Sequence, residues 1–409
     1  MEAFVVGGAV RDFIMGVPYK DRDWVVTGAT EADMLGMGFH KVGKDFPTFL
    51  HPESKEEYSL ARRERKGGVT SFGLDVKLKE DLSKRDLTIN AMVMNDDERV
   101  ADFYGGREDI KNKVLRMVSF ESFVEDPIRV LRVARFAARY PDFTVERETM
   151  KTMRMLVTTG ALNGATPERV WKELEKGLME KKPSRMLQVL RQCGALHVIL
   201  PEVDALYGVP QPVQWHPEVD TGIHVEQVID YAASQNFDLP VRFACLLHDV
   251  GKALSPQATW PAHHGHEGDG VPLVEVACWR LNVPSKLARV AVMTAREHGN
   301  IHSAMKVKTT TIVKVLRRCD AFRNPELFQY VLQASLCDSR GRVGDTVSFA
   351  DREYPQAERF AAALWAAKQV KGGEVAEKYP GRPELIQVAM HAARARAIKQ
   401  FENKQKQAA

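Results

Sequence analysis

The pattern of apolar residues changes character near residue 125, and that change limits the folds this chain can adopt. Before it, short strand-like apolar runs at residues 3–7, 23–27, 57–62 and 90–94 alternate with glycine-rich turns and short helical patterns. After it, apolar residues recur every three or four positions over residues 129–139, 167–180, 184–193, 224–234, 242–247 and most of 272–401. The sequence therefore predicts an α+β chain, in which a small mixed or antiparallel sheet is followed by mostly helical regions.

Length and composition predict several folded domains. A chain of 409 residues exceeds what one hydrophobic core usually serves. With 44% hydrophobic and 27% charged residues it has an ordinary globular composition, and no apolar run approaches the roughly 18 residues of a membrane span. We expect regions at 1–122, 123–210, 222–325 and 326–409, with the Pro- and Gly-containing stretch at 207–222 as a linker, and no membrane partner.

Cysteine usage and charge narrow the setting. The five cysteines are scattered and include no CxxC pair, which predicts neither a zinc knuckle nor a disulfide framework and fits a reducing cytoplasm. The N-terminal apolar run lacks a basic leader and a small-residue cleavage site, so it is expected to form the first strand. The net charge of +4 permits nucleic-acid binding without requiring it.

Two glycines and two aspartates stand close together near the N-terminus. Gly7 and Gly8 lie between a predicted strand and a helix, where backbone N–H groups can approach phosphate oxygens and Arg11, one turn on, can pair with them. Asp21 and Asp23 alternate along the next predicted strand, so both carboxylates are expected on one face, able to share divalent cations. Each pair alone would suit a tight turn or a solvated strand edge. Together they favour two-metal nucleotidyl transfer, which activates a 3′-hydroxyl and steadies the triphosphate.

These residues open a series of motifs that resembles the class II tRNA nucleotidyltransferase and poly(A) polymerase family. Residues 84–91 (KRDLTINA) are similar to the family's RRDFTINA segment, residues 102–110 to its DPxxGxxDL turn, and residues 125–129 (EDPIR) to its EDxxR segment. The similarity continues into residues 166–173 and covers at least residues 4–180. It implies a nucleotidyltransferase head over 1–122 and a helical neck and RNA-binding region over 123–210.

Two positions depart from the family pattern. Lys84 replaces the first Arg of the RRD element, which keeps the charge but loses the planar fork, and Phe103 replaces a Pro in a turn. A third metal-site carboxylate stays open, because Glu64 could supply it but neighbouring basic residues make a surface salt bridge equally plausible. The resemblance implies the following roles: Gly8, Arg11 and Arg85 bind the nucleotide, and Asp21 and Asp23 are catalytic and bind Mg²⁺.

Arginines line one face of the helix predicted at 129–139. Arg129, Arg132 and Arg135 follow Asp126 at intervals of three residues. A solvated face would explain such a helix in isolation, but the excess of arginine favours a phosphate or nucleotide surface. A carboxylate accepts from the exocyclic amine of cytosine or adenine and a guanidinium donates to the adjacent ring nitrogen, so Asp126 and Arg129 could replace a complementary base. The family resemblance implies that templating role, and nucleotide contacts for Arg132 and Arg135.

A second group of metal-binding residue types lies further along. His224 precedes His248-Asp249, which is followed by Val-Gly-Lys and by histidines at 263, 264 and 266. Such ligands suit a transition metal, for example Ni²⁺ or Mn²⁺, more than magnesium. The arrangement resembles the HD phosphohydrolase superfamily, which expects a further Asp on a later helix, yet residues 298–302 contain none. Asp320 and Asp338 are predicted to be helix-cap or surface residues, so the expected site is His224, His248 and Asp249 within 222–325.

The resemblance as a whole implies a bacterial CCA-adding enzyme with an HD domain. It would add C and A nucleotides from CTP and ATP to the 3′ end of tRNA, as a monomer or weak homo-oligomer. The HD domain would supply 2′,3′-cyclic phosphodiesterase and phosphatase activity, unless it is a relic that only supports RNA. Rival interpretations are a poly(A) polymerase, an HD phosphohydrolase whose head only binds nucleotide, and a non-catalytic RNA-binding protein. The HD segment argues against the first and the paired aspartates against the others.

Overall fold

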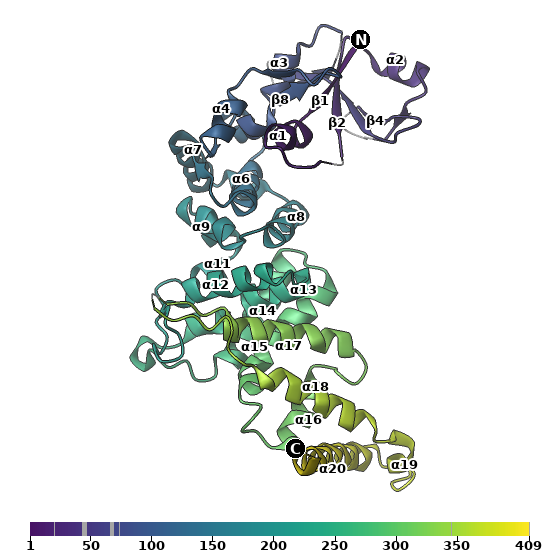
Figure 1. Ribbon diagram of the computed structural model, residues 1–409, viewed down its shortest axis with the longest axis vertical. Helices are drawn as coiled ribbons and strands as arrows, with labels where there is room; N and C mark the ends of the chain where they lie inside the picture. Colours follow the sequence, from purple (N-terminus) through teal and green to yellow (C-terminus); the bar gives the residue numbers. More distant parts are fainter. Residues whose placement is uncertain (20, 43–46, 66–68, 73, 345, 409) are drawn as a thin grey trace. The chain divides into compact units, whose positions relative to one another are not determined.

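The computed structural model describes residues 1–408 apart from 20, 43–46, 66–68, 73 and 345, and of residues 64, 65, 69, 70 and 408 it describes only the backbone. The chain divides into two compact units, Met1–Ala165 with Gln192–Ala195 and Thr166–Arg191 with Leu196–Ala409. The sheet lies in the first unit and helices make up most of the second (Figure 1). The predicted α+β class is therefore confirmed.

A mixed sheet organises the first unit. Its strands are β1 (Glu2–Val6), β2 (Asp23–Thr27), β3 (His40–Lys41), β4 (Thr48–Leu50), β5 (Glu57–Leu60), β8 (Met92–Met94) and β9 (Val100–Asp102). They lie in the order β3-β4-β5-β2-β1-β8-β9, in which β2 and β5 are parallel and the other neighbours antiparallel. The run predicted at 57–62 splits, because β6 (Arg62–Arg65) leaves the sheet to pair with β7 (Val69–Phe72).

Alternation along β1 explains why this sheet is buried on both faces. Successive side chains of a strand point to opposite sides. Val6 packs with Val25 and Val93 on one face, whereas Val5 packs with Trp24 and Met92 on the other, where α1 (Gly8–Ile14) adds Ala9 and Val10. Burying both faces fixes the register of β1 against β2, and that register positions the first residues of β2 beside the β1–α1 turn.

Short elements complete the first unit. They are α2 (Glu31–Gly36), α3 (Leu78–Leu82), the 3₁₀ turn η1 (Thr88–Asn90), α4 (Gly106–Lys111), β10 (Val114–Leu115), α5 (Phe120–Glu125), α6 (Arg129–Arg139), β11 (Thr144–Val145), α7 (Arg147–Thr158) and the 3₁₀ turn η2 (Ala161–Gly164). The bounds of α6 coincide with those predicted from its apolar spacing. Val130, Leu131, Val133 and Ala134 are fully buried or nearly so, which leaves the arginines for the opposite side.

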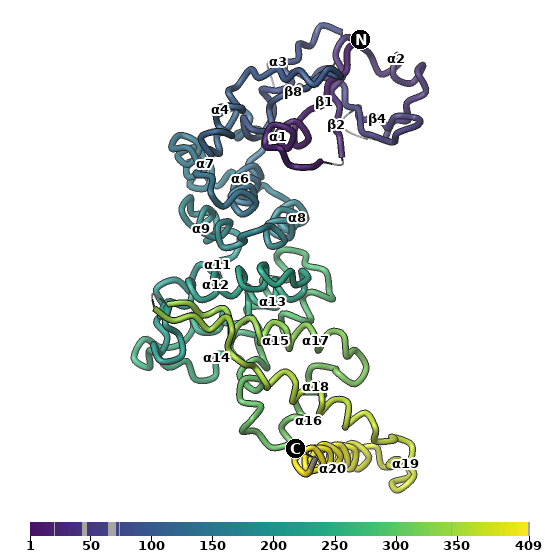
Figure 2. Tube along the Cα trace, in the orientation of Figure 1, coloured from purple at the N-terminus to yellow at the C-terminus, as the bar shows by residue number. Residues whose placement is uncertain are grey.

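The second unit is built from helices. Its elements are α8 (Pro167–Leu178), α9 (Ser184–Gln192), α10 (Ala195–Ile199), α11 (Pro201–Asp204), α12 (Thr221–Ser234), α13 (Leu239–Leu247), η3 (Val250–Leu254), η4 (Gln257–Thr259), α14 (His266–Arg280), α15 (Ser285–His302), α16 (Thr309–Arg318), α17 (Pro325–Arg340), α18 (Pro355–Lys368), α19 (Gly372–Ala376) and α20 (Pro383–Ala408). Helix α13 packs against α12, α15 and α17, and α14 packs against α15. Helices α16, α18 and α20 pack together at the C-terminal end, as the trace in Figure 2 shows. None of the described helices combines the length and the apolar character needed to cross a membrane.

One buried arginine joins α13 to the end of α8. Arg242 is 4% exposed, and its guanidinium donates to the carbonyls of Phe237 at 2.7 Å, Leu178 at 2.9 Å and Glu180 at 3.2 Å. The last carbonyls of a helix have no partner within it, so the arginine satisfies groups that burial would otherwise leave unpaired.

The stretch predicted as a linker at 207–222 is folded against α12 instead. Its two ends are joined, because the Thr221 hydroxyl donates to the Val209 carbonyl at 2.8 Å and the Gly208 N–H donates to Asp220 at 2.6 Å. Gln211 and His216, within this stretch, are buried. Its Pro and Gly residues therefore shape a closed loop, and that loop forms one wall of the histidine site described below.

Candidate active sites

The first candidate site lies where β1 turns into α1. Gly7 has φ 77° and ψ −127°, a conformation that a residue with a Cβ rarely adopts. A Cβ there would also stand 3.0 Å from Nη1 of Arg85, so the glycine lets this guanidinium lie against the turn. Val6 pairs in register with Asp23 on β2. The fold thus brings the glycine turn, Arg85 and Asp23 together.

The two aspartates flank the start of β2. Asp23 is the first residue of the strand and Asp21 precedes it, so the prediction that both alternate along one strand was wrong. Pairing with β1 and β5 begins only at Asp23, which leaves Asp21 exposed. Burial raises the pKa of Asp23, the Arg85 guanidinium opposes that shift, and the charge of Asp21 adds to it. Two carboxylates that repel in this way suit a divalent cation. The side chain of Glu64 lies outside the described residues.

Arg11, expected beside phosphates, is 3% exposed and engaged within the head. Its Nη1 donates to Oδ1 of Asn90 at 2.6 Å, and its Nη2 lies 2.8 Å from Asp12. Its guanidinium also lies 5.5 Å from the ring centre of Phe136 and 5.4 Å from that of Tyr140. Arg11 therefore ties α1 to η1 and α6, and the neighbouring Gly8, which opens α1, is held in place by this anchor.

The arginine face of α6 packs on the KRD segment rather than facing open solvent. Arg129 is 8% exposed and donates to the backbone carbonyls of Arg85 at 3.0 Å and Lys84 at 2.5 Å. Two of its five N–H groups are thereby used and three remain. Arg135 is also buried, with its guanidinium 4.6 Å from the ring centre of Phe136. The sequence indicated the basic face, but not that it would clamp this segment.

Asp86 is the acidic partner of that face. Its Oδ2 accepts from Nε of Arg132 at 2.8 Å, and its Oδ1 accepts from the Leu87 N–H at 2.8 Å and from Nδ2 of Asn90 at 3.0 Å. Burial would raise its pKa, but Arg132 and these hydrogen bonds outweigh that effect and lower the pKa to about 2. Asp126 ends α5, where its carbonyl accepts from the Arg129 N–H at 3.1 Å and its charge favours the charged form of Arg129.

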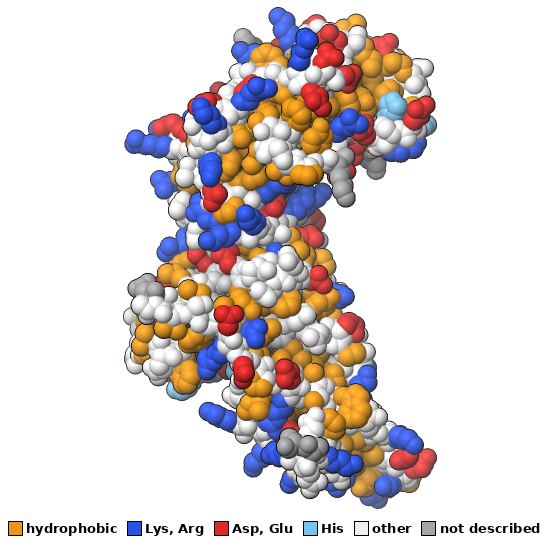
Figure 3. Space-filling view, viewed as in Figure 1, with side chains coloured by type: hydrophobic (Ala, Val, Ile, Leu, Met, Phe, Trp, Pro, Cys, Tyr) orange, Lys and Arg blue, Asp and Glu red, His pale blue; other side chains and the backbone are white. Residues whose placement is uncertain are grey.

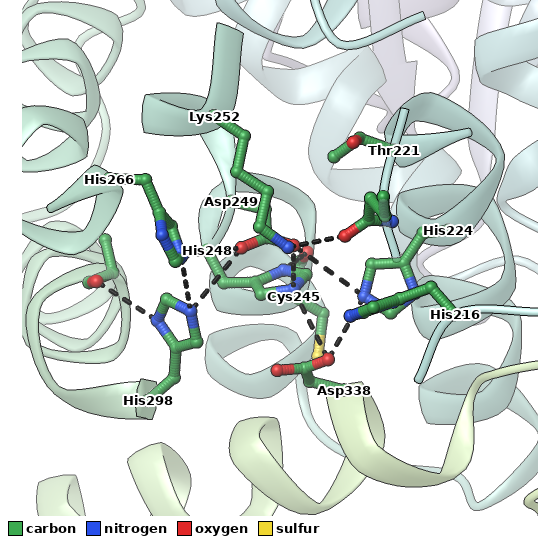
Figure 4. A network of polar contacts seen from close by, with 12 residues as sticks. His216, Thr221, His224, Cys245, His248, Asp249, Lys252, His266, His298 and Asp338 are labelled. Atoms are coloured by element: carbon green, nitrogen blue, oxygen red, sulfur yellow. Dashed lines mark hydrogen bonds and ion pairs between the residues drawn. The ribbon is translucent and has the colours of Figure 1, made fainter. Parts of the chain in front are cut away.

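The second candidate site is a buried cluster of histidines and aspartates in the HD region (Figure 4). His224 lies on α12, His248 and Asp249 follow α13, and Asp338 lies on α17. Nε2 of His224 lies 3.1 Å from Oδ1 of Asp338 and 3.8 Å from Oδ2 of Asp249. Nε2 of His248 lies 3.2 Å from Oδ2 of Asp249 and 3.8 Å from Oδ1 of Asp338. These four atoms, called the tetrad below, converge from three helical segments.

The protonation pattern of the tetrad suits metal binding. Nδ1 of His248 lies 2.8 Å from the Cys245 carbonyl, which only accepts, so the proton is on Nδ1 and Nε2 carries a lone pair. Among the described residues, Nε2 of His248 and Oδ1 of Asp249 are buried without a hydrogen-bond partner. Buried polar atoms are seldom left so. Two imidazoles and two carboxylates that turn acceptor atoms toward one point fit a divalent transition metal.

Further buried groups hold the tetrad in place. Oε1 of Glu218 lies 2.8 Å from Nδ1 of His224, and Nε2 of His302 lies 2.5 Å from Oδ2 of Asp338. Arg342 donates to Oδ1 of Asp338 at 2.8 Å. Against the desolvation that burial imposes, the charge of Arg342 and the neighbouring histidines hold the pKa of Asp338 well below its ordinary value. Such partners fix the orientation of a ligand and keep it in its binding form.

Asp338 corrects the sequence prediction, which made it a cap or surface residue. It is 3% exposed and completes the tetrad, whereas Asp320 does remain at a turn, where it accepts from Arg323 at 2.6 Å. The signal for Asp338 was its place on a helical stripe with the buried Leu327, Val331 and Ala334. Sequence reasoning missed it because it searched near residue 298 for the later aspartate.

Lys252 and Gln211 also belong to this site and were not predicted. Nζ of Lys252 donates to Oδ2 of Asp249 at 2.7 Å and to Oε1 of Gln211 at 2.5 Å, and both side chains are buried. Gln211 escaped because its loop has the composition of a linker. The Lys252 ammonium places a positive charge beside the tetrad, where it can attract a phosphate.

Three family models match the chain in succession. They are described as "Poly A polymerase head domain" over residues 3–116, "Probable RNA and SrmB- binding site of polymerase A" over residues 142–207, and "HD domain" over residues 221–324. Domains of the first and third kinds use divalent metals. Their order matches the order of the two candidate sites along the chain.

Proteins similar over the full length carry one name. Multifunctional CCA proteins of Janthinobacterium sp. (strain Marseille) and Herminiimonas arsenicoxydans are each 52% identical to this chain over 408 residues, covering 97% of both chains. A solved CCA-adding enzyme with ATP has a TM-score of 0.62 at 19% identity, over 97% of this chain and 86% of its own. The Thermotoga maritima CCA-adding enzyme complexed with tRNA has a TM-score of 0.59 at 18% identity, over 98% and 91%. These two structures share the fold, and the full-length identity shows that the chain belongs to the multifunctional CCA protein family.

Proposed function

We propose that this chain adds C, C and A to the 3′ end of tRNA from CTP and ATP without a nucleic-acid template. The observation that carries the proposal is the meeting of Asp23, Asp21 and Arg85 at the Gly7 turn. Membership in a family named for CCA over its whole length supports it. Solved CCA-adding enzymes of the same fold were determined with ATP and with CTP.

In this proposal the catalytic residues are Asp21 and Asp23, which hold Mg²⁺. Magnesium at that position would favour attack by the tRNA 3′-hydroxyl and departure of pyrophosphate. The backbone of Gly8 and the guanidinium of Arg85 bind the triphosphate, because they border the same turn. Arg11 contributes through its buried contacts with Asn90 and Asp12, which keep the turn and the KRD segment in register.

Base selection is proposed for Asp126 and Arg129. The Asp126 carboxylate would accept from the exocyclic amine that cytosine and adenine share, and an unused N–H of Arg129 would donate to the ring nitrogen beside it. Uracil and guanine present the opposite pattern and would be rejected. Arg132 and Arg135 would hold the nucleotide from the next turns of α6, with Asp86 fixing the first of them.

The tRNA is proposed to lie along basic helices of the second unit. Lys172, Lys176, Lys181 and Lys182, in α8 and the turn that follows it, are all exposed. Basic side chains gather over α8 and α9 in Figure 3. Phosphate contacts by such residues fix the register of an RNA and carry no sequence information. This region also falls within the match to the RNA-binding family model.

The HD site is proposed to hydrolyse phosphate esters, including 2′,3′-cyclic phosphates at damaged RNA ends. Water would add to phosphorus, one ester P–O bond would break, and the released oxygen would take a proton. A transition metal such as Ni²⁺ or Mn²⁺ on the tetrad would supply the activated water, and Lys252 would position the phosphate. All five cysteines are unpaired and buried, which supports a cytoplasmic protein, acting as a monomer or weak homo-oligomer.

The test incubates purified protein with tRNA lacking its last three nucleotides, Mg²⁺, and CTP and ATP separately and together. CTP alone should give two added nucleotides, and both together should give three, after which extension stops. Unlimited addition from ATP alone would instead establish a poly(A) polymerase. No extension under any condition would leave the head as a nucleotide-binding domain and refute the proposal.

A further inference from the structure

We propose that the HD region binds a second divalent transition-metal ion, held by Oδ1 of Asp249 and Nε2 of His266 and His298. This second site adjoins the tetrad, and Asp249 would contribute one oxygen to each ion. The inference rests on the proposed hydrolase function of the HD region and deepens it. A pair of ions can engage two oxygens of one phosphate, so the site would take phosphate monoesters and cyclic phosphodiesters.

Distances among the three atoms fit a single ion. Oδ1 of Asp249 lies 3.4 Å from Nε2 of His266 and 3.4 Å from Nε2 of His298, and the two nitrogens lie 3.2 Å apart. The point equidistant from three atoms so spaced is about 1.9 Å from each, which is the mean side divided by √3. Zinc, as a guide to ions of this size, sits about 2.0–2.2 Å from such ligands. An ion slightly out of the plane would therefore bind all three without movement of the backbone.

The protons on the two histidines leave these three atoms as acceptors. Nδ1 of His266 lies 2.7 Å from the carbonyl of His263, and Nδ1 of His298 lies 3.1 Å from the carbonyls of Thr294 and Ala295. Carbonyls only accept, so each Nδ1 carries the proton and each neutral ring turns a lone pair toward the other. Together with the Asp249 oxygen they form three acceptors with no donor among them, and a cation removes that repulsion.

Asp249 faces two ways. Its Oδ2 lies toward His248 and accepts from Lys252 at 2.7 Å, whereas its Oδ1 lies toward His266 and His298 and, among described residues, has no hydrogen-bond partner. Figure 4 shows His266 and His298 on one side of Asp249 and His224 on the other. A carboxylate whose two oxygens serve different imidazole pairs is placed to bridge two ions.

Close packing of glycines builds this second site. A Cβ on Gly251 would collide with the carbonyl of His266 and with the backbone of Gly270, and a Cβ on Gly299 would collide with Glu267. These glycines allow η3, α14 and α15 to approach until the first residue of α14 meets α15. The contact brings His266 to His298, so the backbone is shaped around the pair.

The test counts ions. The chain carrying Asp21→Asn and Asp23→Asn, which removes the head's cation ligands, is loaded with Mn²⁺, desalted and analysed by inductively coupled plasma mass spectrometry. Two ions per chain are expected. His266→Gln or His298→Gln should lower the count to one, and His264→Gln, at an exposed neighbour, should leave it at two. Circular dichroism and the thermal unfolding midpoint establish that each variant is folded.

One ion per chain in the parent, or an unchanged count in a folded variant that lacks both histidines, would overturn the proposal. Phosphatase activity toward a phosphate monoester, measured on the same samples, separates it from the hydrolase function. Activity with a single ion would refute the second site and keep the hydrolase. Two ions that respond to the histidine variants, without any hydrolysis, would keep the second site and refute the hydrolase.

Discussion

Asp86→Asn offers a quantitative test of the buried network beneath the nucleotide site. Asp86 is 5% exposed and accepts from Arg132, Asn90 and Leu87. Its pKa of about 2, against an ordinary 3.8, favours the charged form in the folded protein by about 2.4 kcal/mol, at 1.36 kcal/mol per unit. The amide keeps the size but loses the charge and turns a donor toward one of these donors. We expect the head to lose about 2 kcal/mol of stability at pH 7.

Hydrogen exchange measured by mass spectrometry follows the head separately from the second unit. Amides of the protected core strands should exchange roughly 30-fold faster in Asp86→Asn, and KM for CTP should rise because Arg132 loses its anchor. Because the folded pKa is depressed, the stabilisation is complete above 3.8 and fades as pH falls toward 2, so at pH 3 the gap to wild type should shrink by about 1 kcal/mol. Asp142→Asn, at the exposed pair with Lys113, is the control. The reasoning fails if Asp86→Asn costs no more than this control, or if the gap is the same at both pH values.

Three further variants test other parts of the account. Gly7→Ala should reduce nucleotide addition at least about 100-fold while tRNA binding persists, because positive φ and the nearby Arg85 exclude a Cβ; addition at the wild-type rate would contradict this. Glu218→Gln should weaken Mn²⁺ binding at the HD site about 10- to 100-fold through His224, with nucleotide addition unaffected; equal affinity in a Mn²⁺ titration would argue against it. Arg242→Met should destabilise the second unit by about 2–4 kcal/mol in urea unfolding, since three backbone carbonyls lose their donor; a loss below 1 kcal/mol would refute this role.

Local pattern in the sequence predicted the elements well and the long-range partners poorly. The bounds of α6 followed from apolar spacing, and the strand at 23–27 from a β-type run with a clear start. What α6 packs against did not follow, because contact between Arg129 and the carbonyls of Lys84 and Arg85 spans more than forty residues of chain. Periodicity describes a face and is silent about what covers it.

The HD site shows the same limit more sharply. The adjacent pair His248-Asp249 could be recognised from spacing, but Asp338 follows some ninety residues later on α17 and stands among apolar neighbours. Its burial was readable from its helical stripe, whereas its partners depend on how α12, α13 and α17 pack. Gln211 was missed for the opposite reason, since a Pro- and Gly-rich composition marks loops without saying which loops are buried.

Nucleotide addition by the Asp21→Asn, Asp23→Asn double variant tests the central claim most directly. Wild type and variant are given the same truncated tRNA with CTP, ATP and Mg²⁺, and products are resolved at single-nucleotide length. Wild type should add two C and one A, and the variant should extend less than about one thousandth as fast, with its HD phosphatase activity intact as proof of folding. Extension by the double variant at a rate near that of wild type would contradict the account.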